Sequence, residues 1–177
     1  MVKKLAKFLG YSLFFLMALL YFSPKVSIYY FLERELAAHA IVISSKEVLD
    51  SGFALNLQHA KLSLKTIETA TISEINLKIF ALYNKLECRD IRLAGAAQSF
   101  IPLHVESASL RYGVLDPLHV RAKIKGDFGE AYVEFHLLTQ ALHVEMIPSD
   151  LMLQEYKHTL ANMSKNQNGE YIYDKTL

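Results

Sequence analysis

The chain has 177 residues, of which 52% are hydrophobic and 21% charged, so it is long enough for one domain with a core and a short appendage. Nineteen basic residues against 18 acidic ones give a formal net charge of +1, which excludes the strong basic field typical of nucleic-acid-binding domains. The single cysteine, Cys88, excludes an internal disulfide framework and multi-cysteine zinc or iron–sulfur sites.

The first 24 residues have the composition of a membrane anchor. Lys3, Lys4 and Lys7 precede an uncharged stretch, residues 8–24, which reads FLGYSLFFLMALLYFSP. As a helix this stretch would be roughly 25 Å long at ~1.5 Å per residue, close to the ~30 Å of bilayer hydrocarbon. A cleaved signal peptide is the alternative, but the end of the stretch lacks the small residues of a cleavage site.

The charges around this segment predict its orientation. Three lysines lie before it and only Lys25 follows closely, so the positive-inside rule places residues 1–7 in the cytoplasm. We expect residues 8–24 to cross the bacterial inner membrane once and the rest of the chain to lie in the periplasm. That remainder is mildly acidic and contains no run of basic residues typical of a site for lipid headgroups.

Residues 25–40 have the period of an amphipathic helix. Apolar residues recur every three or four positions, while Glu33, Arg34 and Glu35 occupy the other side. We predict a juxtamembrane helix that covers one end of the following domain. A helix that lies in the membrane surface or pairs with a partner is the alternative. The predicted apolar face consists of Ile28, Phe31, Leu32, Leu36 and Ala40.

From Ile41 the apolar period changes to two, and one strand pattern then repeats four times. Each copy consists of two alternating runs joined by a skipped position, which indicates a β-bulge or a bend inside the strand. The copies are too close together for units that contain helices, so we expect an antiparallel meander. Equivalent positions are Leu57, Ile72, Cys88 and Val105, spaced by 15, 16 and 17 residues.

The C-terminal part predicts more strands and a helix. The sequence GDFGE at residues 126–130 suits a hairpin turn because its glycines tolerate turn conformations. Ser149 follows a proline and suits the N-cap of a helix that extends to Met163. Residues 164–169 are expected to form a polar loop, and the tail a final edge strand. The further strands are expected at residues 120–124, 131–137 and 142–146.

These elements predict an α+β, mainly β fold. It has one N-terminal transmembrane helix, a short amphipathic helix, and then a curved antiparallel sheet of bent strands with a C-terminal helix; residues 41–177 form the periplasmic β-rich domain. Because two short helices hardly cover the apolar face, the sheet either curls into a sandwich-like roll or leaves an apolar groove for a lipid or a partner. Candidate groove-lining residues, for which a plain core role is the alternative, are Leu57, Leu62, Ile72, Leu77, Ile91, Leu93 and Leu110.

Few residues suggest reaction chemistry. Two of the seven histidines, His104 and His119, follow Pro-Leu in a duplicated PLHV. No HExxH or other metal-ligand spacing accompanies them, so we expect them on the polar face of the sheet. Cys88 alternates with apolar neighbours and is expected to be buried, while Asp116 and Asp127 suit turns. We therefore predict no catalytic residues, no metal site, no cofactor and no enzymatic activity.

The anchor, the helix after it and the bent-strand repeats resemble the AsmA-like superfamily and, within it, the GspN family of type II secretion proteins. The resemblance is carried by FLERELAAHAIVIS at residues 31–44, GFALNLQHAKLSL at 52–64 and KLECRDIRL at 85–93. It implies an inner-membrane protein whose periplasmic sheet forms a taco-like groove, associated with envelope transport or secretion. LptC-like proteins, with one anchor and a β-jellyroll, are a second candidate, although they lack a helix directly after the anchor.

The sequence thus predicts a non-enzymatic accessory or scaffold protein of an envelope secretion or transport system, with envelope proteins as partners. The anchor, the curved sheet and the lack of a reactive constellation motivate this prediction. The alternative is a periplasmic lipid-binding or lipid-transfer protein whose apolar β-groove holds acyl chains.

Overall fold

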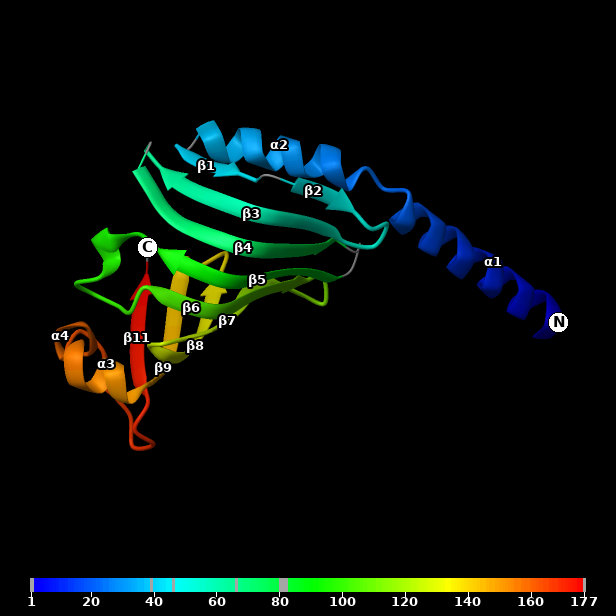
Figure 1. Ribbon diagram of the computed structural model, residues 1–177. Helices are drawn as coiled ribbons and strands as arrows, with labels where there is room; N and C mark the ends of the chain where they lie inside the picture. Colours follow the sequence, from blue (N-terminus) through cyan, green and yellow to red (C-terminus); the bar gives the residue numbers. More distant parts are fainter. Residues whose placement is uncertain (1, 39, 46, 66, 80–82, 177) are drawn as a thin grey trace.

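The computed structural model describes residues 2–38, 40–45, 47–65, 67–79 and 83–176, and it consists of one large antiparallel sheet with a few helices (Figure 1). The prediction of a mainly β fold is confirmed. The helices are α1 (Val2–Tyr21), α2 (Lys25–Ala38), the 3-10 turn η1 (Gly95–Ala97), α3 (Asp150–Glu155) and α4 (Lys157–Leu160). The strands are β1 (Ile41–Ser44), β2 (Glu47–Asp50), β3 (Leu55–Leu64), β4 (Ile67–Ile79), β5 (Tyr83–Leu93), β6 (His104–Gly113), β7 (Asp116–Gly126), β8 (Gly129–His136), β9 (Ala141–Pro148), β10 (Ser164–Lys165) and β11 (Tyr171–Thr176).

The sheet is a meander over most of its width. Its order is β1-β3-β4-β5-β6-β7-β8-β9-β11-β10, and β2 also pairs with β3. From β3 to β9 each strand pairs antiparallel with the next one in sequence, as predicted from the repeats. The path of paired strands does not close, so the sheet is open. The tail forms β11 beside β9, and Ser164 and Lys165, predicted as loop, pair with it.

The skipped positions of the repeats form a bend that crosses four strands. His59, Ser73, Asp90 and Glu106 lie opposite one another, and the pairing register is the same on both sides of them. An unchanged register means a bend and not a bulge, since a bulge would add a residue to one strand. His59 and Asp90 have positive φ angles of 53° and 46°, which reverses the alternation of the side chains there. Apolar residues before and after the bend therefore share one face.

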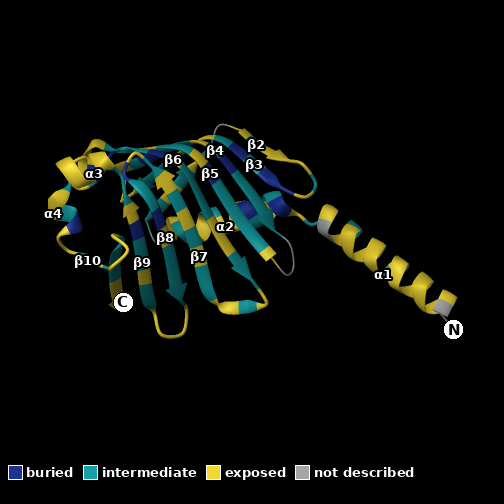
Figure 2. Cartoon of the chain, turned by 90° about the horizontal axis from the view of Figure 1, so that it is seen from below, coloured by how far each residue is buried: buried dark blue, intermediate teal, exposed yellow. Residues whose placement is uncertain are grey.

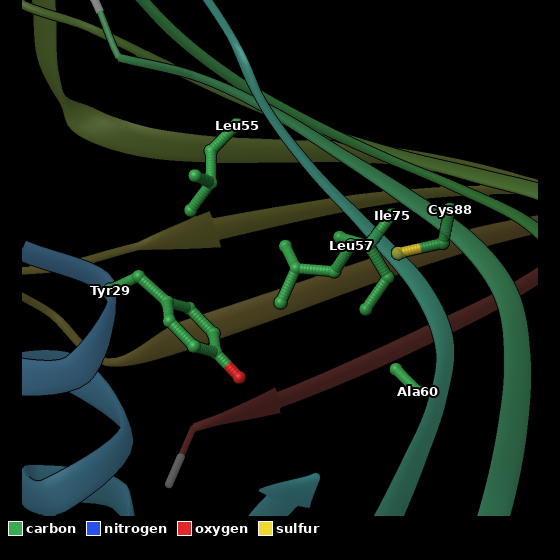
Figure 3. Packing of buried hydrophobic residues seen from close by; sticks show 6 residues of the cluster. All are labelled: Tyr29, Leu55, Leu57, Ala60, Ile75 and Cys88. Carbon is green, nitrogen blue, oxygen red and sulfur yellow. The ribbon is translucent and has the colours of Figure 1, made fainter. Parts of the chain in front are cut away.

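The first hydrophobic cluster lies under α2 (Figure 3). Tyr29 of α2 packs against Leu55, Leu57, Ile75 and Cys88 of the sheet. Full burial of a leucine side chain contributes roughly 1.5–3 kcal/mol, so Leu55 and Leu57 attach this helix firmly. The prediction that the helix after residue 25 covers one end of the domain is confirmed.

The predicted apolar face of this helix is wrong in part: Ile28 and Leu36 are half-buried, but the most buried residues lie elsewhere on the helix. Phe31 and Leu32 are exposed, whereas Lys25 and Tyr29 are the buried residues of α2. The helix ends at Ala38, and Ala40 has a positive φ of 62°. A tyrosine can bury its large ring while its hydroxyl meets a polar group. The predicted face consists of aliphatic residues and phenylalanine, and it therefore misses Tyr29.

A second cluster covers the other end of the sheet. Met152 of α3 and Leu160 of α4 are buried against Val105, Phe128 and Met146. The Ser149 hydroxyl oxygen accepts a hydrogen bond from the Met152 amide at 3.2 Å, which confirms the predicted N-cap. The single helix predicted to reach residue 163 is instead two short helices. The backbone leaves the helical region at Tyr156, whose side chain packs against this cluster.

Helix α1 projects away from the sheet, as both general views show (Figures 1 and 2). It begins at Val2, before the predicted segment 8–24, and ends at Tyr21. Across the described residues, no helix combines the length and the apolar character needed to cross a membrane. The predicted transmembrane helix is therefore not supported as a span.

The hairpin turn between β7 and β8 gives a test of the fold. Gly129 has a φ of 112°, and a Cβ there would meet the Ile147 carbonyl oxygen and lie 2.7 Å from the Ser149 nitrogen. We expect Gly129→Ala to destabilise the protein by roughly 1–3 kcal/mol more than Gly169→Ala, because backbone atoms cannot move aside cheaply. Gly169 also has a positive φ, 87°, but open space around it, so this control isolates the steric clash. Urea unfolding followed by circular dichroism measures both, and equal losses would contradict the prediction.

Candidate functional site

The candidate site is the apolar face of the sheet. The register aligns apolar side chains in rows that run across the strands, because the strands from β3 to β9 pair antiparallel. One row joins β3 to β9 without a polar residue: Leu55, Leu77, Leu86, Leu110, Ala122, Val133 and Val144. Such a face needs cover, since isolated apolar residues on a surface are common but a continuous patch marks an interaction site.

All seven predicted groove-lining residues lie on this face, but in different surroundings. Leu57 is only 2% exposed and belongs to the packed core, whereas Leu110 is 38% exposed. Ile91 contacts both clusters and so joins the two ends of the core. The remaining four are half-buried: Ile72 and Leu77 against the first cluster, Leu93 against the second, and Leu62 opposite Ala70.

One row of the apolar face in β6 to β9 belongs to neither cluster. Leu110, Ala122, Val133 and Val144 are absent from both, and only Leu110 among them is exposed. Beside them, β9, β11 and the segment around α4 line an open hollow of about 570 Å³. Its walls include Val144, Met146, Met163 and Tyr173. This region could accommodate an apolar chain or a partner's side chains.

The duplicated histidines do not come together. His104 lies between the carboxylates of Asp90 and Asp127, at 3.4 and 3.3 Å. His119 lies 2.6 Å from Asp116, near the opposite end of the sheet. The hydrogen bond with His119 lowers the pKa of the Asp116 carboxyl, and that from Ser73 lowers the pKa of Asp90. Within the described ranges, no group of three such side chains is arranged to hold a metal ion.

The polar face carries a basic row that the sequence analysis missed. Lys78, Lys85, Arg111 and Arg121 lie opposite one another on β4 to β7. They are far apart in sequence, so a search for runs of basic residues could not find them. The register of the predicted meander is the signal that would have revealed the row. Three of the four are paired with carboxylates, Lys78 and Lys85 with Glu87 and Arg121 with Asp116 and Glu134, so the expectation that the body of the chain carries no patch for lipid headgroups stays a prediction.

The junction of α1 with the sheet is packed. The Tyr21 ring meets the Phe53 ring edge-on, with centroids 5.3 Å apart, and lies over Gly52, whose φ is 80°. The Lys25 ammonium is buried and donates to the carbonyl oxygens of Tyr21 and Ser23, at 3.2 and 3.3 Å. A cation at these carbonyls stabilises the C-terminal end of a helix. Lys25 is thus a structural residue as well as a charge that follows α1.

Comparisons of the chain with models of known families, with curated proteins and with solved structures give no match. The resemblance to AsmA-like and GspN proteins stays a prediction.

The burial of Cys88 gives a chemical test of the core. Burial raises the pKa of its thiol to about 11, so the reactive thiolate is scarce at pH 8. We expect the native protein to resist Ellman's reagent and the urea-unfolded protein to react at once. Rapid stoichiometric labelling of the native protein would contradict the packing of Cys88 beneath α2.

Proposed function

We propose that this protein is a non-enzymatic, membrane-attached accessory or scaffold of a bacterial envelope secretion or transport system. Helix α1 inserts into the inner membrane and holds the sheet on its periplasmic side. The sheet acts by binding an envelope partner. Type II secretion is the system that the predicted resemblance suggests.

The observation that carries this proposal is the exposure of α1 on every side. Its large apolar residues from Leu5 to Leu19 are between 49% and 74% exposed. Figure 2 colours nearly the whole helix as exposed. Phe8, Leu13 and Phe14 are all exposed and point in different directions around the helix, so no single protein surface would cover them. A lipid environment covers all sides at once, with Lys3, Lys4 and Lys7 at the headgroups.

Charges introduced into α1 test the attachment. We expect Phe14→Asp with Met17→Asp to release the full chain from alkaline-washed membranes, because each charge costs roughly 2.5–3.5 kcal/mol in a bilayer. Both side chains are exposed, so the sheet should fold as before. The matched control, Ile67→Asp with Phe100→Asp, adds two charges at exposed apolar positions of the sheet domain and should stay bound. Release of the unaltered chain by the wash would refute the attachment.

A lipid-binding role is the second candidate. It is favoured by the row of Leu110, Ala122, Val133 and Val144, which neither cluster includes, and by the hollow beside it. An acyl chain would bury this surface at roughly 25 cal/mol per Å².

Photocrosslinking separates the two candidates. We expect benzoylphenylalanine in place of Leu110, in cells that produce the full chain, to crosslink to a protein, because a scaffold covers this face with its partner. The control is Ser109, the adjacent residue of β6 on the polar face. Adducts of phospholipid mass at position 110 alone would favour the lipid-binding role. Equal adducts at both positions would contradict a specific role for the apolar face.

A further inference from the structure

One end of the sheet faces the same way as α1. Tyr21, at the end of α1, contacts Gly52 and Phe53 just before β3 begins. Leu55, the first residue of β3, is in register with Leu110, three residues before the β6–β7 turn. The β8–β9 turn lies at this end too, since β7 pairs with β8. Figure 2 shows both turns along the lower edge of the sheet, with α3 and α4 at its upper left.

Apolar side chains occupy both turns. Leu115 is 95% exposed, more than any other large apolar residue described, and Leu138 is 75% exposed. Val114 and Leu137 beside them are exposed as well, and the Leu137 amide donates to the Leu118 carbonyl at 2.8 Å, which joins the two turns. We name Val114, Leu115, Leu137 and Leu138 the anchor-side rim.

The basic row lies directly behind this rim. Arg121 is neutralised by Asp116 and Glu134, each at 2.7 Å, and the bond to Arg121 lowers the pKa of Glu134. Arg111 faces Lys85 and Arg121 across the strands, and in the part of the chain that the structure describes it forms no ion pair. It lines a hollow of about 520 Å³ together with Leu115, Tyr83 and Tyr132. Exposed apolar side chains with tyrosines and an unpaired arginine beside them match the chemistry of a bilayer interface with anionic headgroups.

We propose that the anchor-side rim is a second membrane contact, in which Leu115 and Leu138 enter the interface of an anionic phospholipid bilayer and Arg111 binds a lipid phosphate. This proposal rests on the proposed attachment through α1. The two contacts together fix the orientation of the sheet: its rim meets the bilayer, and the end that carries α3 and α4 points away. The partner of the scaffold would then approach from that distal end or from the apolar face.

Single tryptophans test the proposal, because the chain contains none. Three full-length variants, Leu115→Trp, Phe100→Trp and Phe15→Trp, are placed in vesicles of phosphatidylcholine and phosphatidylglycerol, with and without brominated acyl chains. Phe100 is an exposed aromatic residue that precedes β6, at the other end of that strand from Leu115. We expect brominated lipid to remove at least half of the emission at positions 15 and 115, and none at position 100.

The other outcomes are equally decisive. Quenching at position 15 but not at 115 would overturn the rim contact and leave the attachment intact. Quenching at neither position would refute the attachment as well. Quenching at 115 and 100 alike would overturn the orientation, because the whole domain would then lie on the bilayer.

A second pair of variants excludes an effect of the tryptophan itself. We expect Arg111→Glu, added to Leu115→Trp, to abolish the quenching at position 115, since it places a negative charge at the lipid phosphates. The matched control is Arg92→Glu, an exposed arginine in register with His104 at the distal end, which should leave quenching unchanged. Unchanged quenching with Arg111→Glu would overturn the role of this arginine.

Discussion

The bend at His59, Ser73, Asp90 and Glu106 is the constraint on which the rest of the structure depends. In a strand without it, side chains alternate strictly, and the apolar residues after the bend would face the polar side. Because adjacent strands bend at the same place, their apolar rows stay aligned on both sides of it. The hydrogen bond from Ser73 to Asp90, at 2.7 Å, joins two of the bent positions. A continuous apolar face follows from this alignment.

The two ends of that face are covered in different ways. Tyr29 of α2 closes the end near β3, and Met152 and Leu160 of α3 and α4 close the other. Ile91, just after the bend, touches both clusters and joins them into one core. The part of the face around Leu110, near the β6–β7 turn, belongs to neither cluster, and we propose that a partner covers it. The same row of residues therefore supplies both the core and the proposed binding surface. A residue that lies under a helix belongs to the core, and an uncovered one is available for binding.

The proposed function combines three surfaces with different chemistry. Helix α1 is apolar on all sides, the rim around Leu115 is apolar with Arg111 behind it, and the face around Leu110 is apolar and follows the register of the sheet. Lipid suits the first two, because each needs a medium that adapts to projecting side chains. A protein partner with a complementary surface suits the third, since the sheet holds its side chains in fixed positions.

The sequence by itself determined most of the strands, the meander from β3 to β9 and the positions where the strands deviate from strict alternation, because these follow from local alternation and turn chemistry. The hairpin at Gly126 and Gly129 and the cap at Ser149 are of this kind. The register then decided that each deviation is a bend and not a bulge. Only the tertiary structure decided which candidate residues became core, as with Leu57 and Leu110, since burial depends on which helix lies above each one. The face of α2, its buried Lys25 and the basic row also needed tertiary information, because distant segments meet there through packing and register, which a local pattern does not encode.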